Sequence, residues 1–162
     1  MTTRRHARVL TAADRTAESE RRFSHPFNPR SEIRGFTLGD PVGLTRIGVH
    51  LTTIPPGKES FVYHRHHSEE EFVYILSGRG VAEIDGEEVE VFAGDFIGYP
   101  AGTAHHLRNA GEADLVYLSG GERREMEIAD FPRHGKRMVR VGGRISVHSM
   151  EAEALGPMPK LE

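Results

Sequence analysis

The residues with the clearest potential for chemistry are the histidines and glutamate of the segment YHRHHSEEEF. His64 and His66 are two residues apart, and side chains at that spacing in a β-strand point to the same face, so both imidazoles could reach one ion. Four residues then turn the chain before Glu71 opens the apolar run EFVYILSG. This spacing predicts that two imidazoles and one carboxylate converge from neighbouring strands on a divalent metal ion.

A fourth ligand is available from His105, which follows the turn sequence PAGT at the start of another expected strand. Each piece alone is common on protein surfaces, since an H-x-H pair, a run of glutamates and a histidine after a turn occur without any metal. The sequence has no cysteine, which excludes a disulfide framework and a thiolate site. Imidazole and carboxylate ligands suit Fe²⁺, Mn²⁺, Ni²⁺, Co²⁺ or Zn²⁺, and the sequence does not choose among them.

The elements that must position these residues are short alternating apolar runs between residues 41 and 120. Gly, Pro, Asn and Asp separate the runs, which is the pattern of an antiparallel barrel or sandwich. The pair Asp85-Gly86 indicates a tight hairpin turn. Residues 1–40 are polar and basic, and we expect an arm packed on the barrel, with a short helix over 11–23 as the alternative. Residues 121–162 form a C-terminal extension, in which we expect a strand over 144–148.

Two spaced motifs in residues 42–120 resemble those of the cupin superfamily. The first runs through Gly57, His64, His66, Glu71 and Gly78, with six residues instead of the usual five before His64. The second runs through Gly94, Pro100, Gly102, His105 and Asn109 and departs from the family pattern nowhere. The resemblance implies an all-β cupin fold, a double-stranded β-helix or jelly-roll barrel. It also implies that His64, His66, Glu71 and His105 bind one divalent metal ion and leave positions open for water or substrate.

Several other polar residues are candidates for substrate binding. Lys58 keeps the parity of His64 if the strand is regular, which would place a cation at the barrel mouth, and Arg46 is a second candidate. His50 lies on the polar face of its run and is expected either to line the cavity or to face solvent. His67 and His106 are each adjacent to an expected ligand and should point away from the metal.

The favoured function is a sugar or sugar-phosphate isomerase that uses the metal as a Lewis acid. The sequence is similar to the small mannose-6-phosphate-isomerase-like cupins, and a cation at the rim suits a small anionic sugar. The catalytic base is unknown. An Fe²⁺-dependent dioxygenase and a non-catalytic binding protein remain the alternatives, because the fold alone does not decide function.

Composition narrows the expected partners. The formal net charge of −3 does not favour nucleic acid, and there is no apolar run long enough for a membrane span or a signal peptide, so we expect a cytoplasmic protein. Aromatic residues expected on outward strand faces would be covered by a partner or by the chain's own arm, and we expect a homodimer. These residues are Phe61, Tyr63, Phe72 and Tyr74.

Overall fold

The computed structural model describes residues 6–151, and within that range the protein is built from thirteen strands and three single-turn 3₁₀ helices, with no α-helix. The strands are β1 (Arg21–Phe23), β2 (Ile33–Thr37), β3 (Ile47–Ile54), β4 (Arg65–His66), β5 (Glu71–Ser77), β6 (Arg79–Ile84), β7 (Glu87–Phe92), β8 (Phe96–Tyr99), β9 (His105–Asn109), β10 (Leu115–Glu122), β11 (Met126–Phe131), β12 (Lys136–Val141) and β13 (Arg144–Ser149). The 3₁₀ turns are η1 (Ala12–Asp14), η2 (Asp40–Val42) and η3 (Pro132–His134). In this range the all-β prediction is confirmed.

One layer of the barrel is a six-stranded antiparallel sheet in the order β1-β2-β3-β10-β5-β8. Residues alternate between its two faces, so Ile54, Ile75 and Leu115 point inward and are fully buried. Glu71 shares this inward face with Val73 and Ile75, as the sequence predicts, because the three residues are spaced by two along β5.

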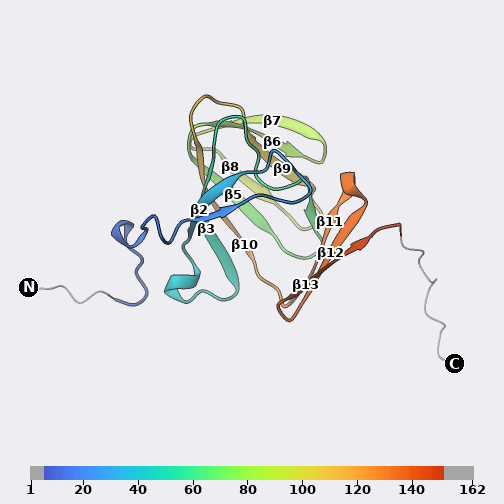
Figure 1. Ribbon diagram of the computed structural model, residues 1–162, viewed down its shortest axis with the longest axis horizontal. Helices are drawn as coiled ribbons and strands as arrows, with labels where there is room; N and C mark the ends of the chain where they lie inside the picture. The colour runs from blue at the N-terminus through green and yellow to red at the C-terminus, as the bar shows by residue number, and fades with distance from the viewer. Residues whose placement is uncertain (1–5, 152–162) are drawn as a thin grey trace, which may run out of the picture.

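The opposing layer consists of two smaller sheets, β7-β6-β9 and β13-β12-β11-β4 (Figure 1). The two sheets are joined by a β-bridge between His64, which directly precedes β4, and His105, which begins β9. Buried side chains from both layers form one core, which includes Ala82, Val91 and Leu107 from the smaller sheets. This two-layer arrangement is the jelly roll that the motifs implied.

Several turns follow the sequence pattern. Asp85 and Gly86 have φ values of 50° and 89° and form a two-residue hairpin turn between β6 and β7. Gly102, with φ of 90°, shapes the turn before β9 and donates its amide hydrogen to the carbonyl oxygen of His66 at 2.7 Å. The buried Asn109 amide donates to the carbonyl oxygens of Ile54 and Ala113, which ties the rim loop as expected.

The N-terminal arm and the C-terminal extension both add strands, within residues 6–151. The segment 11–23 contains the 3₁₀ turn η1 and the strand β1 instead of a helix, and β1 pairs with β2 at the edge of the six-stranded sheet. At the other end, β11 pairs with β4 beside the histidines, while β12 and β13 extend outward in the orange and red part of Figure 1. The expected strand over 144–148 is present as β13. No helix in the described residues is long and apolar enough to cross a membrane.

The four aromatic residues expected on outward faces have different surroundings in the structure. Phe61 lines the internal cavity and is stacked by Phe23 of the arm, with ring centroids 4.7 Å apart. The expectation of an outward face is wrong for Phe61 because residues 61–63 are not a regular strand. Tyr63 is covered by the Arg133 guanidinium at 4.1 Å, Phe72 stacks on Phe96, and Tyr74 is 39% exposed.

Candidate metal centre and cavity

His64 and His105 are fixed as a directly opposed backbone pair. The His64 amide donates to the His105 carbonyl oxygen at 3.1 Å, and the His105 amide donates back at 2.7 Å. The Nδ1 atoms of the two rings lie 2.8 Å and 3.0 Å from the carbonyl oxygens of Val62 and Thr103. A carbonyl oxygen can only accept a hydrogen bond, so each Nδ1 carries the hydrogen and each Nε2 is left with a free lone pair.

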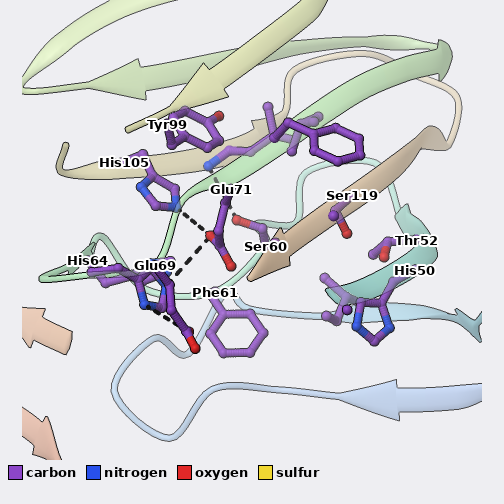
Figure 2. A pocket seen from close by; sticks show the side chains of 18 of the residues that line it. His50, Thr52, Ser60, Phe61, His64, Glu69, Glu71, Tyr99, His105 and Ser119 are labelled. Atoms are coloured by element: carbon purple, nitrogen blue, oxygen red, sulfur yellow. Dashed lines mark hydrogen bonds and ion pairs between the residues drawn. The ribbon is translucent and has the colours of Figure 1, made fainter. Parts of the chain in front are cut away.

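Glu71 and His66 complete a compact group with these rings. Glu71 Oε2 lies 3.1 Å from His105 Nε2 and 3.6 Å from His66 Nε2. One possible ligand atom from each of His64, His66 and Glu71 lies within 4.8 Å of the other two. Figure 2 shows His64, Glu71 and His105 pointing toward one another from three different strand segments. The structure thus brings together all four residues of the predicted ligand set, with His105 joined through Glu71.

The electrostatics of this group match a cation site. Burial, followed by the neighbouring His105 and His66 rings, lowers the pKa of His64 to about 3. Burial alone would raise the pKa of Glu71, but the three neighbouring imidazoles, His105 first, lower it overall. At neutral pH His64 is therefore neutral and Glu71 is ionised, which are the forms in which these residues bind metal. The donor set fits one divalent cation.

Tyr99 is a site residue that the sequence analysis missed. Its ring stacks on His105, with centroids 4.0 Å apart and an angle of 9° between the planes. Its buried hydroxyl has no hydrogen-bond partner among residues 6–151. Burial and the Glu71 carboxylate raise the pKa of Tyr99, so the hydroxyl stays protonated. The available signal was its position directly before Pro100 of the second motif.

The group faces a cavity of about 470 Å³ between the two layers. His50, Thr52 and Ser119 lie on the far wall from the histidines (Figure 2). His50 therefore lines the cavity, as one of the two expectations for it stated. Burial, and next the positive charge of Arg123, lower the pKa of His50.

The other two expected substrate-binding residues are not among the residues that line this cavity. Lys58 forms an ion pair with Glu32 at 2.9 Å. Lys58 would share the parity of His64 only in a regular strand through both residues, but β4 begins only at Arg65. Arg46 is exposed, and its carbonyl oxygen accepts a hydrogen bond from the Arg123 amide.

Arginines from outside the two motifs contribute to the cavity wall instead. The lining includes Arg21, Arg34, Arg123 and Arg140. Three of them form ion pairs with carboxylates, namely Arg34 with Asp114, Arg123 with Asp40 and Arg140 with Glu69. Arg21 has no carboxylate partner within residues 6–151. It pairs in register with Gly35, which pairs with the inward-facing Thr52, so Arg21 lies on the cavity side of β1.

The two histidines next to ligands have other partners. His67 Nε2 lies 2.8 Å from Asp130 Oδ2, and His106 Nε2 lies 3.4 Å from Glu59 Oε2. His106 also contributes to the cavity wall. Neither ring is part of the group formed by His64, His66 and Glu71.

Comparison with known proteins agrees with the fold and the motifs. A cupin domain model matches residues 50–120. The structure of the "putative sugar phosphate isomerase" from Acidithiobacillus ferrooxidans is 36% identical, covers 93% of this chain and 97% of its own, and superimposes with a TM-score of 0.86. The barrel topology and the His/Glu group that lines its cavity together define the class of protein. The chain belongs to the cupin superfamily.

Two further relatives bear on function. A sugar phosphate isomerase of the cupin superfamily from Silicibacter pomeroyi is 27% identical, covers 76% of this chain and 80% of its own, and has a TM-score of 0.71. The oxalate-binding protein of Thermotoga maritima is 39% identical over 66 residues, which are 41% of this chain and 54% of that protein. The chain spans about half the length of the two curated relatives from Methanocaldococcus jannaschii and Thermotoga maritima that it matches.

Proposed function

We propose that this protein is a metal-dependent isomerase that acts on a small sugar phosphate. The observation that carries the proposal is that the His/Glu group and His50 line opposite walls of one cavity (Figure 2). A substrate held between them has its carbonyl oxygen at the metal centre and its carbon chain within reach of an imidazole. The cavity volume of about 470 Å³ lies in the range of small-molecule sites.

The chemistry needs a Lewis acid and a base. A divalent ion held by His64, His66, Glu71 and His105 would supply the Lewis acid, which makes the C–H next to the substrate carbonyl more acidic. His50 is the base in this proposal. It is neutral at pH 7 because burial lowers its pKa, so its free ring nitrogen can accept the proton from one carbon and return it to the neighbouring carbon, while the proton of the substrate hydroxyl passes to the former carbonyl oxygen. The transfer needs no oxidant and releases no leaving group.

The phosphate is assigned to Arg21. A guanidinium without a carboxylate partner can give both of its hydrogen-bonding edges to a phosphate dianion. The other cavity arginines are already engaged by Asp114, Asp40 and Glu69. In this proposal the N-terminal arm, which carries Arg21 on β1, forms part of the substrate site. Arg21 takes the role that the sequence analysis gave to Lys58 and Arg46.

The relatives from Acidithiobacillus ferrooxidans and Silicibacter pomeroyi support this assignment, since both carry the name of a sugar phosphate isomerase and both match most of the chain. The similarity to an oxalate-binding protein supports a second candidate, the binding of a small dicarboxylic acid without turnover. Arginines on the cavity wall would suit either kind of anion.

The test is to incubate the metal-loaded protein with aldose and ketose phosphates in D₂O and follow the sugars by NMR. The proposal predicts interconversion with deuterium entering the carbon next to the carbonyl, at the same rate in air and in an anaerobic chamber. The His50→Ala variant should lose most of the exchange while still binding metal. Oxalate that binds tightly while no sugar phosphate reacts would favour the binding protein. Turnover that requires Fe²⁺ and air would favour a dioxygenase.

A further inference from the structure

The three imidazoles of the metal centre are held in different ways. Nδ1 of both His64 and His105 faces a backbone carbonyl oxygen within hydrogen-bond distance. His66 Nδ1 has no such partner: it is buried and makes no hydrogen bond with any described residue. Its nearest acceptors are two carboxylate oxygens, Glu127 Oε1 at 3.5 Å and Glu69 Oε2 at 3.9 Å. A ring nitrogen aimed at carboxylates in a buried site carries the hydrogen itself.

Glu127 is the closer carboxylate, and its own hydrogen bonds fix it in place. It belongs to β11, in the C-terminal extension outside the matched cupin segment. Its side chain is completely buried. Oε1 accepts the amide hydrogens of His67 at 2.9 Å and Ser68 at 3.3 Å, and Oε2 is bonded to the Ser68 hydroxyl. These three donors come from the turn that directly follows His66, so the same hydrogen bonds fix the Glu127 carboxylate relative to the His66 ring.

Glu69 differs from Glu127 in how its charge is balanced. Glu69 Oε1 accepts hydrogen bonds from the Arg140 guanidinium and the Arg124 amide. Glu127 has no lysine or arginine partner in the described part of the chain, and His66 is the one basic side chain paired with it there. The negative charge of Glu69 is therefore largely matched by Arg140, whereas that of Glu127 remains available to the His66 ring.

We propose that Glu127 is the positioning residue for His66: it holds the hydrogen on Nδ1, so that Nε2 presents its lone pair toward Glu71 and the metal ion. A carboxylate behind a metal-binding imidazole fixes the tautomer and the orientation of the ring and makes it a stronger ligand. This inference rests on the metal centre of the proposed function. The C-terminal extension then contributes to the metal centre. Glu127 of β11 accepts the Nδ1 hydrogen of His66, as backbone carbonyl oxygens do for His64 and His105.

The test compares the full-length protein with its Glu127→Gln and Asp130→Asn variants. Gln keeps the size of the side chain and an oxygen acceptor but removes the charge. Asp130 is the matched control, since it lies on the same strand, is equally buried and binds Arg65, Arg137 and His67 without facing His66. Two quantities are measured: the zinc affinity, by competition with a coloured chelator, and the tautomer of the His66 ring in the metal-free chain, by long-range ¹H–¹⁵N NMR.

We expect Glu127→Gln to weaken zinc binding by about 10- to 100-fold and to reduce the population of the Nδ1–H form of His66. Asp130→Asn should lower the melting temperature while leaving both quantities unchanged. The proposal is overturned if His66 of the wild-type chain carries its hydrogen on Nε2. It is equally overturned if Asp130→Asn weakens zinc binding as much as Glu127→Gln does. If Glu127→Gln has both expected effects but the wild-type protein isomerises no sugar phosphate, the proposed function is refuted and the role of Glu127 is upheld.

Discussion

His64 and His105 are joined by two reciprocal backbone hydrogen bonds, of 3.1 Å and 2.7 Å, although they are 41 residues apart in the sequence. Their pairing closes the second layer of the barrel at the point where the metal centre lies. The distance between two expected ligands is therefore set by the sheet itself. A site held in this way is organised before any ion binds, because the backbone and not the ion fixes its ligands.

The first prediction concerns pH and the buried His64. Burial, together with His105 and His66, lowers its pKa from 6.5 to about 3. Between these two pH values the unfolded chain binds a proton that the folded chain does not, so the stability of the metal-free protein should fall as the pH falls through this window. Urea unfolding at several pH values measures the effect. A His64→Gln variant should show a flatter profile, and an equally steep profile in that variant would contradict the assignment.

Replacing Arg21 should weaken the binding of phosphorylated substrates alone. We expect Arg21→Ala to raise KM for a sugar phosphate by about 10- to 100-fold with little change in kcat, because a hydrogen bond to a charged group that is shared by ground and transition states is lost. Arg22→Ala is the matched control, since Arg22 is the next residue of β1 and pairs with Glu20 at 3.4 Å. Equal KM values for the Arg21→Ala and wild-type proteins would remove the arm from the substrate site.

Tyr99 should act through its ring and not through its hydroxyl. Tyr99→Phe keeps the stack on His105 and removes a hydroxyl that has no partner in the described residues, so we expect a stability change below about 1 kcal/mol. Tyr99→Ala removes the ring and should cost about 3 kcal/mol and loosen metal binding. Calorimetry and zinc titration of the two variants provide the measurement. A large loss of metal affinity in Tyr99→Phe would show that the hydroxyl has a role of its own.

We expect the protein to form a homodimer through the outer face of the six-stranded sheet. Large apolar side chains are exposed on that face, and an exposed apolar patch of this kind is usually covered by a partner. They are Ile47 (48% exposed), Tyr74 (39%), Leu76 (45%) and Phe96 (67%). Light scattering should give twice the chain mass of 18.1 kDa, and Phe96→Glu should give the monomer. A wild-type monomer at high concentration would contradict this expectation.

The sequence predicted the barrel and the four expected ligands because both depend on local spacing. The residues of H-x-H share a strand face, and positive φ at Gly102 allows the turn that delivers His105. What could not be predicted comes from contacts between distant segments. Arg21 reaches the cavity only through the pairing of β1 with β2, and Glu127 approaches His66 only because β11 pairs with β4. Neither residue belongs to a spaced motif.

The position of the Lys58 side chain could not be predicted from alternation along the sequence. Its parity with His64 holds only in an extended strand, but residues 60–63 form no regular strand and β4 begins only at Arg65. The ion pair with Glu32 then holds the Lys58 ammonium outside the cavity lining. A count of alternating residues is reliable where ladder hydrogen bonds continue, and it fails in an irregular segment.

The most direct test of the central claim is the metal content of the untagged protein, measured by plasma mass spectrometry for the wild type and two neighbouring variants. We predict about one divalent ion per chain in the wild type, a nearly metal-free His66→Ala variant, and a His67→Ala variant that keeps its ion, because His67 faces Asp130. Equal metal content in the two variants, or a wild-type protein that holds no divalent ion after reconstitution, would contradict the assignment of His64, His66, Glu71 and His105 as a metal centre.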